Sequence, residues 1–274
     1  MTTEQVRAGA EWLALREPAD AAARAVDLVD ELRPYLDGKR FVQVQDLGCG
    51  TGSMARWLAG QLPGPQHWVL TDRDADLLTV AAADPPERCA DGAPVTVETR
   101  RRDITRLDAA DLTGLDLITA SALLDMMTAQ ELERLVTTCA DARCPALITL
   151  SVVGEVELAP DDPLDRVVVD AFNAHQRRAT AAGRLLGPNA VDAAVRGFAA
   201  LGLDVVVRPS PWRLRGDQAA LATEWFTGWL AAACEQRPDL EATTRSYARD
   251  RLSEAAAGRL SVTVQHQDLL VRPR

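Results

Sequence analysis

The sequence has almost no lysine. Lys39 is the only one, so arginine supplies 29 of the 30 basic residues. Together with abundant alanine, this is typical of a GC-rich coding bias, and we infer no function from the arginine content alone. Acidic residues outnumber basic ones 40 to 30, which gives a formal net charge of -10. Because nucleic-acid affinity depends on clustered cations that neutralise phosphates, we do not expect a DNA or RNA partner.

Paired cysteines and long apolar runs are also missing. The five cysteines are odd in number and contain no Cys-x-x-Cys pair, which disfavours a disulfide framework or a zinc knuckle and fits a reducing compartment. No stretch approaches 18 apolar residues, and the first 30 residues carry acids where a signal peptide would be apolar. We therefore expect a cytoplasmic protein without a membrane partner, either a monomer or a homodimer.

Strand-like and helix-like segments alternate along the chain. The first strand leads through a glycine turn into a helix, and another helix is expected at 75–83 before Pro85. This alternation favours an α/β fold with a parallel, doubly wound sheet. The expected strands are 41–46, 67–71, 95–99, 116–120, 146–153, 203–207 and 261–271.

Three segments lie outside this alternation. Residues 1–37 are alanine-rich and predict a helical cap that is broken at Glu17-Pro18. Residues 154–188 and 209–259 are too long for ordinary connections and contain helical stretches. We expect a single domain, 1–274, in which the cap and both insertions form a substrate lid.

The glycine turn decides between two cofactor classes. A dinucleotide fingerprint has the spacing Gly-x-Gly-x-x-Gly, whereas Gly48, Gly50 and Gly52 are spaced Gly-x-Gly-x-Gly. Asp46 precedes the turn, where a carboxylate would repel a pyrophosphate and suit a sulfonium or ammonium group. Asp72, at the end of the second strand, suits an adenosine ribose and therefore serves NAD or S-adenosylmethionine equally.

These residues resemble a known family. The run VQDLGCGTG (44–52), the acid ending VLTD, the RRDIT segment and the strand LDLITAS resemble the first four motifs of class I S-adenosylmethionine-dependent methyltransferases. The resemblance covers roughly residues 41–153, and the last two expected strands fit the family's terminal antiparallel hairpin. It implies a Rossmann-like, mainly parallel seven-stranded sheet of order 3-2-1-4-5-7-6. It also implies S-adenosylmethionine as cofactor and S-adenosylhomocysteine as product.

The same resemblance implies roles for individual residues on the cofactor side. Asp46, Gly48 and Gly50 would line the methionine part, Asp72 would hold the ribose, and Arg73 would flank the adenine.

Further along the chain, the resemblance implies Asp103 at the adenine amino group, with Ile104 beside the ring. Ser121 would lie on the path between cofactor and substrate. From the residues alone, contact of Asp103 with the adenine amino group and a structural role, as a helix N-cap or a solvated acid, fit about equally well.

Candidates on the acceptor side come from the residues themselves. Asp125 follows the fourth strand, where it can orient an amine or accept a proton, or cap the next helix. His175, within the 154–188 insertion, is the candidate general base. Arg178, with Arg177, suits a carboxylate or phosphate on a small substrate, the alternative being a solvated helix face.

Three further residues have open roles. Arg16 and Arg24 flank the break in the cap, and one of them is expected at the methionine carboxylate. Trp212, in a Pro-Ser-Pro-Trp segment, is expected in an exposed loop against the substrate, whereas Trp225 and Trp229 lie at helical spacing that is typical of core packing.

No metal is expected, since Ser121 stands where a metal-dependent transferase would carry carboxylates. The predicted function is methyl transfer to a small molecule, in specialised or cofactor metabolism. Two alternatives stay open: a non-methylating rearrangement or cyclisation that uses the bound sulfonium, and a partner protein that binds the cofactor without turnover.

Overall fold

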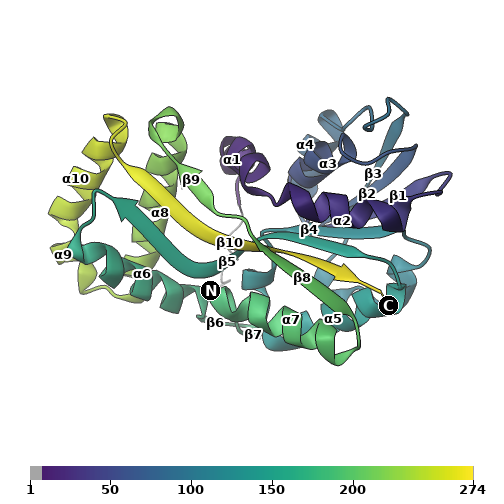
Figure 1. Ribbon diagram of the computed structural model, residues 1–274. Coiled ribbons are helices and arrows are strands. Elements are labelled where there is room, and N and C mark those ends of the chain that lie inside the picture. Colours follow the sequence, from purple (N-terminus) through teal and green to yellow (C-terminus); the bar gives the residue numbers. More distant parts are fainter. Residues whose placement is uncertain (1–7, 274) are drawn as a thin grey trace.

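One large twisted sheet organises the protein. Its strands are β1 (Val42–Leu47), β2 (Gln66–Asp72), β3 (Val95–Arg101), β4 (Leu117–Ser121), β5 (Ala146–Ala159), β8 (Asp204–Pro209), β9 (Trp212–Leu214) and β10 (Ser261–Arg272). The computed structural model describes residues 8–273, and in this range the sheet order is β3-β2-β1-β4-β5-β10-β8 (Figure 1). β1 to β5 are parallel, whereas β10 runs antiparallel to β5, β8 and β9.

The predicted strand order is confirmed. β8 and β10 are the sixth and seventh strands expected from the sequence, so the observed path is 3-2-1-4-5-7-6. One strand was not expected: β9 is short and pairs with the outer half of β10 from Val262 to Val264. Because β9 follows a Pro-Ser-Pro run, the sequence indicated a loop there. A two-residue hairpin, β6 (Ala179–Thr180) and β7 (Gly183–Arg184), is also separate from the main sheet.

Helices cover both faces of the sheet. Their bounds are α1 (Ala10–Ala23), α2 (Val26–Leu36), α3 (Ser53–Ala59), α4 (Ala75–Ala83), α5 (Ala129–Ala142), α6 (Pro163–Gln176), α7 (Ala190–Ala200), α8 (Ala219–Gln236), α9 (Leu240–Thr243) and α10 (Arg245–Ala256). One core cluster joins α2, α3 and α4 to one face, and another joins α5 and α7 to the other. Among the described residues no helix has the length and apolar character that a membrane crossing requires.

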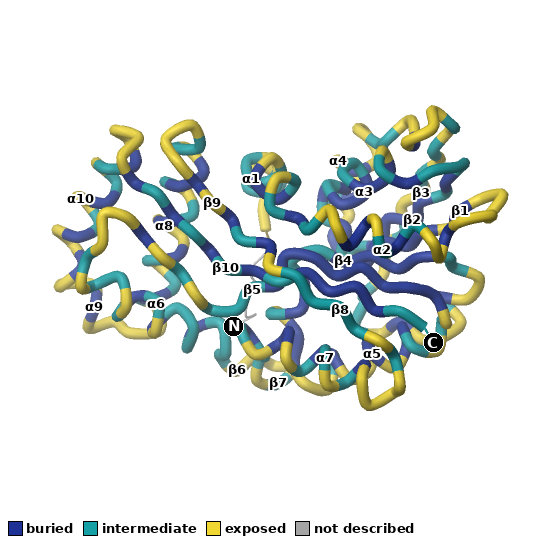
Figure 2. The backbone as a smooth tube through the Cα atoms, viewed as in Figure 1, coloured by how far each residue is buried: buried dark blue, intermediate teal, exposed yellow. Residues whose placement is uncertain are grey.

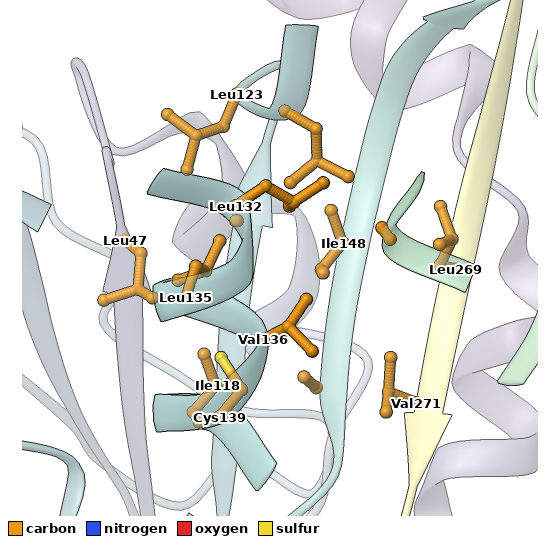
Figure 3. Close-up of a cluster of buried hydrophobic side chains, with 14 of the residues drawn as sticks. Leu47, Ile118, Leu123, Leu132, Leu135, Val136, Cys139, Ile148, Leu269 and Val271 are labelled. Atoms are coloured by element: carbon orange, nitrogen blue, oxygen red, sulfur yellow. The ribbon is translucent and has the colours of Figure 1, made fainter. Parts of the chain in front are cut away.

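Helix α5 illustrates how the sequence sets the packing. Thr128 and Glu131 form a reciprocal capping box that satisfies the first free backbone N–H groups of the helix. Leu132, Leu135 and Val136 then repeat at helical spacing and face β4, β5 and β10, as Figure 3 shows. The apolar stripe therefore fixes which side of α5 lies on the sheet.

The N-terminal cap differs from the prediction at its break. Helix α1 continues through Pro18 to Ala23, so the expected break at Glu17-Pro18 is wrong. An interior proline costs about 3 kcal/mol of helix stability, and α1 is held on both sides of it by the ion pairs of Glu17 with Arg56 and of Arg16 with Asp20. The chain bends after Arg24 instead. The first seven residues of the expected cap lie outside the described residues.

Strands β5 and β10 extend beyond the edge of the parallel sheet as a two-stranded ribbon. The expected insertion at 154–188 therefore begins within β5, which continues to Ala159. The ribbon carries α6, α8, α9, α10 and β9, which we call the outer lobe, on the left of Figure 1. Figure 2 shows that buried residues recur along β10 into this lobe, whereas β5 is mostly half-buried or exposed there. Trp225 and Trp229 pack there, Trp229 buried in the lobe core and Trp225 stacked on it, as the helical spacing predicted.

A buried carboxylate joins the cap to the sheet. Asp268 of β10 is fully buried and accepts hydrogen bonds from the backbone N–H groups of Ala25 (2.8 Å) and Leu150 (2.7 Å) and from the Ser210 hydroxyl (2.5 Å). Ala25 lies between α1 and α2, and the bond to Asp268 replaces the helical bond that its N–H would otherwise make. Asp268 therefore determines where the cap bends.

Replacing Asp268 by alanine is expected to lower the free energy of unfolding by at least about 3 kcal/mol, because three buried donors lose their acceptor. Asp268→Asn keeps one acceptor oxygen and should cost less. Asp250→Ala, which removes an exposed carboxylate of α10, is the control and should change stability by less than about 0.5 kcal/mol. Equal denaturant midpoints for Asp268→Ala and Asp250→Ala would contradict the assigned role.

Candidate functional site

The glycine turn lies at the carboxyl end of β1. Gly48, Gly50 and Gly52 all have positive φ angles, of 66°, 55° and 86°, which favour glycine over residues with a side chain. The N–H groups of Gly48 and Cys49 both donate to the carbonyl oxygen of Thr71 on β2, at 2.8 and 3.0 Å. The turn is thus bound to the neighbouring strand and leads into α3.

Because the first two glycines have no side chain, neighbouring side chains can approach the turn closely. A Cβ atom at Gly48 would lie 3.1 Å from Leu123, and a Cβ atom at Gly50 would lie 3.1 Å from Leu13 of α1. Helix α1 therefore passes directly over the turn. The resulting cradle is narrow, and side chains at either glycine would fill it.

Asp72 fixes the shape of this cradle. One carboxylate oxygen accepts from the N–H of Gly50 (3.0 Å) and the other from the N–H of Asp74 (2.9 Å). Each oxygen has a further lone pair for a ligand hydroxyl. Arg73, which the resemblance assigned to the adenine, is exposed, and its carbonyl accepts from Arg101.

Asp103 has the capping role that the sequence left open. It caps the short 3₁₀ helix Ile104–Arg106, with one oxygen accepting from both the N–H and the hydroxyl of Thr105. Ile104 lies beside the position of a Gly48 Cβ, at 3.8 Å, so it borders the cradle. The structure therefore brings Asp103 and Ile104 to the same edge as the glycine turn.

Asp46 is 1% exposed, and only one of its oxygens has a partner. Thr119 donates to one carboxylate oxygen at 2.7 Å, and the other oxygen has no hydrogen-bond partner among the described residues. Burial raises the pKa of Asp46 to about 7. Such an acceptor is ready for a cation or a donor.

Arg24 is the complementary group. It is 3% exposed, and one terminal nitrogen donates to the hydroxyls of Ser53 (3.3 Å) and Ser121 (3.2 Å). Its Nε and Nη1 atoms are buried and have no partner among the described residues. Burial lowers the pKa of Arg24, whereas the charges of Asp20, Asp268 and Asp46 raise it.

Arg16, the other candidate for the methionine carboxylate, is already engaged. It forms a two-pronged ion pair with the buried Asp20, with N···O distances of 3.0 to 3.2 Å, and its guanidinium lies 4.8 Å from the ring centre of Trp212. Of the two arginines, Arg24 is thus the one with unpaired donors that are buried beside the turn.

The expectation of an exposed Trp212 is wrong. Trp212 is 3% exposed and belongs to β9, and its indole N–H donates to Asp20 at 2.9 Å. Pairing with β10 turns its ring under Arg16, which explains the burial. Two prolines indicated a loop because proline lacks a ladder donor, but the strand begins just after them.

Asp125 lies in the 3₁₀ helix Leu124–Met126, after the end of β4. It is not the cap of α5, because Thr128 has that role. Burial raises the pKa of Asp125 to about 6, and the charges of Arg16 and Arg178 oppose this shift. Asp125 is therefore within electrostatic reach of both arginines.

His175 lies at the end of α6 and is mostly buried. Its Nε2 atom is 3.2 Å from Glu235 of α8, and its Nδ1 atom is 3.5 Å from a guanidinium nitrogen of Arg178. Burial and the charge of Arg178 lower the pKa of His175. Arg177 instead donates to Asn173 and Asn189 and lines a separate cavity of about 350 Å³.

Sequence reasoning missed three partners in the site. Ser53 and Thr119 hold Arg24 and Asp46, and Asp268 positions the chain next to Arg24. For Asp268 a signal existed, since it is an acid on the strand face that also carries Val262, Val264 and Leu270. No spacing rule connects Ser53 or Thr119 to its partner. The described residues contain no cluster of three or more His, Cys, Asp or Glu that could hold a metal.

Comparisons with known proteins agree with this geometry. A methyltransferase domain family matches residues 44–145, from β1 to the residue before β5. The match confirms the resemblance to class I S-adenosylmethionine-dependent methyltransferases over that part of the chain, and with it the predicted cofactor. No curated protein matches the sequence.

One solved structure supports the fold, and two others are less similar. The cyclopropane synthase MmaA2 from Mycobacterium tuberculosis shares 11% identity over 96% of this chain and 94% of its own, with a TM-score of 0.51. A protein described as a sarcosine dimethylglycine methyltransferase from Galdieria sulphuraria gives 15% identity, 90% and 84% coverage and a TM-score of 0.45. A methyltransferase from Geobacter sulfurreducens, solved with S-adenosylhomocysteine, shares 15% identity over 96% of this chain and 98% of its own, with a TM-score of 0.43.

The raised pKa of Asp46 predicts how stability depends on pH. The folded protein holds this proton more tightly than the unfolded chain, so wild-type stability should fall as pH rises from about 4 to about 7. Asp46→Asn cannot ionise. The melting temperature of Asp46→Asn minus that of the wild type should therefore increase by at least roughly 3 °C from about pH 5 to about pH 8.

The measurement is a series of thermal melts without ligand, with the exposed Asp250→Asn as the matched control. A difference between Asp46→Asn and wild type that stays constant with pH would show that Asp46 ionises normally.

Proposed function

We propose that this protein is an enzyme that transfers a methyl group from S-adenosylmethionine to a small-molecule acceptor. The observation that carries the proposal is the pair of unsatisfied buried groups beside the glycine turn, namely Nε and Nη1 of Arg24 and one oxygen of Asp46. A ligand with both an anionic and a cationic end satisfies both groups, whereas a pyrophosphate would meet the Asp46 carboxylate.

The residues present fit this cofactor. Arg24 would hold the carboxylate of its methionine part, and Asp46 its ammonium group. Asp72 would accept from the ribose hydroxyls. Asp103 would meet the adenine amino group through its second oxygen, with Ile104 against the ring. The bound cofactor supplies a methyl group activated by its positive sulfur.

The protein's part in the reaction is alignment and exclusion of water. Helix α1 lies over the turn through Leu13 and is held there by the ion pair of Glu17 with Arg56 on α3, at 2.6 Å. We propose that α1 and α2 form the cap, and that the insertions 154–188 and 209–259 form the rest of the lid over the acceptor.

Acceptor chemistry is proposed at Asp125. Its carboxyl, with a pKa of about 6, is ionised in most copies at neutral pH and can accept a proton from a nucleophile. Both nitrogens of His175 face partners, so we assign it the role of positioning Arg178 in place of the general base. Arg178 would contact the acceptor, whereas Trp212 supports the site by anchoring Asp20.

The five cysteines are free thiols, which supports a cytoplasmic location. We also propose that the protein acts alone or as a homodimer, without nucleic-acid or membrane partners, in specialised or cofactor metabolism.

The cofactor assignment predicts a clear difference between two arginines. S-adenosylhomocysteine should raise the melting temperature of the wild type, and NADH should not. Arg24→Met should weaken S-adenosylhomocysteine binding roughly 10- to 100-fold, because a charge-assisted hydrogen bond is lost. Arg16→Met, which breaks a pair internal to the protein, should change the affinity less than threefold.

Isothermal titration calorimetry gives the affinities, and melts without ligand show whether each variant is folded. Stabilisation by NADH alone would contradict the cofactor assignment. Equal losses in Arg24→Met and Arg16→Met would remove Arg24 from the site.

Methyl transfer itself is tested by incubating the enzyme with S-adenosylmethionine and a metabolite extract and measuring S-adenosylhomocysteine. Asp125→Asn should lower turnover at least about tenfold while leaving cofactor affinity unchanged. If no S-adenosylhomocysteine forms with any extract although the cofactor binds, methyl transfer is contradicted, and a non-methylating rearrangement or a binding partner without turnover takes its place. Demethylated cofactor without a methylated product would likewise count against transfer.

A further inference from the structure

Two charged groups of opposite sign, Asp125 and Arg178, lie within electrostatic reach of each other. The segment after Asp125 and the segment after Arg178 lie side by side: the N–H of Leu186 donates to the carbonyl of Met127 at 2.8 Å, and Thr128 bridges to Leu185. The N–H of Leu185 in turn donates to the carbonyl of Arg178 at 3.1 Å. This pairing holds Arg178 next to the 3₁₀ helix that carries Asp125.

Arg178 has hydrogen-bond donors that are available to a ligand. Only its Nη1 atom has a partner among the described residues, namely the carbonyl oxygen of His175 at 3.2 Å and the Nδ1 atom of the same residue at 3.5 Å. His175 is itself anchored by Glu235 at 3.2 Å. The remaining donors, Nε and Nη2, can bind an anion in the forked geometry of a carboxylate or phosphate.

Asp125 offers the opposite chemistry at the same place. Its carboxyl forms no hydrogen bond with another side chain of the described residues. Its neighbour Met126, the last residue of this helix, is 54% exposed. A carboxylate so placed accepts hydrogen bonds from an amine and leaves the nitrogen lone pair for the methyl group.

We propose that the acceptor is a small amine that also carries a carboxylate or phosphate, with its nitrogen at Asp125 and its anionic group at Arg178. This inference rests on the methyl transfer proposed above. The nitrogen lone pair forms the new C–N bond as the methyl–sulfur bond breaks, and the electron pair of that bond stays on sulfur. The proton released from nitrogen goes to Asp125 and then to water. A neutral phenol or alkene would leave the Arg178 charge without a counter-ion.

The test uses cofactor labelled in its methyl group and a metabolite extract. The labelled product should be retained both by a cation exchanger in acid and by an anion exchanger in base, as expected of an amine with an anionic group. Alkaline phosphatase then distinguishes the two anions, because it abolishes anion-exchange retention only for a phosphate ester. A labelled product with a single charge type, or with none, overturns the inference and leaves methyl transfer standing.

Two matched arginine variants complete the test with the purified acceptor. Arg178→Met should raise KM for that acceptor roughly 10- to 100-fold, with kcat changed less than threefold, and Arg178→Lys should recover part of the loss. Arg177→Met, at the adjacent position but facing the other cavity, should leave KM within twofold. Equal KM values for Arg178→Met and Arg177→Met overturn the assignment. Absence of any labelled product contradicts the proposed methyl transfer and the acceptor class together.

Discussion

The three hydrogen bonds accepted by the carboxylate of Asp268 hold together parts of the chain that are far apart in sequence. They fix the bend between α1 and α2, the backbone of β5 at Leu150, where φ is 56°, and the connection between β8 and β9 at Ser210. Arg24 is the residue just before that bend. Its guanidinium therefore enters the space under α1 because Asp268 determines where the helix stops.

The layer between α1 and the sheet is unusually rich in buried charge. Asp20, Arg24, Asp46 and Asp268 are each at most 5% exposed. Buried charges are costly unless they are paired or hydrogen-bonded, and Asp268 is fully satisfied whereas Arg24 and Asp46 are not. The unsatisfied pair faces the glycine turn, so the side chains of Arg24 and Asp46 are already removed from water before a zwitterionic ligand binds. This is the preorganisation expected of a binding site.

Much of this arrangement follows from the sequence because it depends on local rules. Alternation and glycine spacing predicted the strand order and the turn at Gly48, since strand faces and positive φ angles are set by nearby residues. The contacts that complete the site are different. Arg24 reaches Ser121 across 97 residues, and Asp268 reaches Ala25 across 243, and no periodicity encodes such pairs. Trp212 and the helix through Pro18 were mispredicted for the same reason, because tertiary contacts outweighed local preference.

The ribbon of β5 and β10 has a consequence for how this fold can change. Opposite Asp268, β5 carries two residues, Thr149 and Leu150, so the strands shift register there before they continue into the outer lobe. Side chains on a strand alternate between faces, and a one-residue change reverses every side chain that follows. A lobe taken from another protein can therefore be joined to this sheet only if the junction adds or removes an even number of residues in each ribbon strand. An odd splice would turn the apolar face of the lobe to water even if each part were well folded alone.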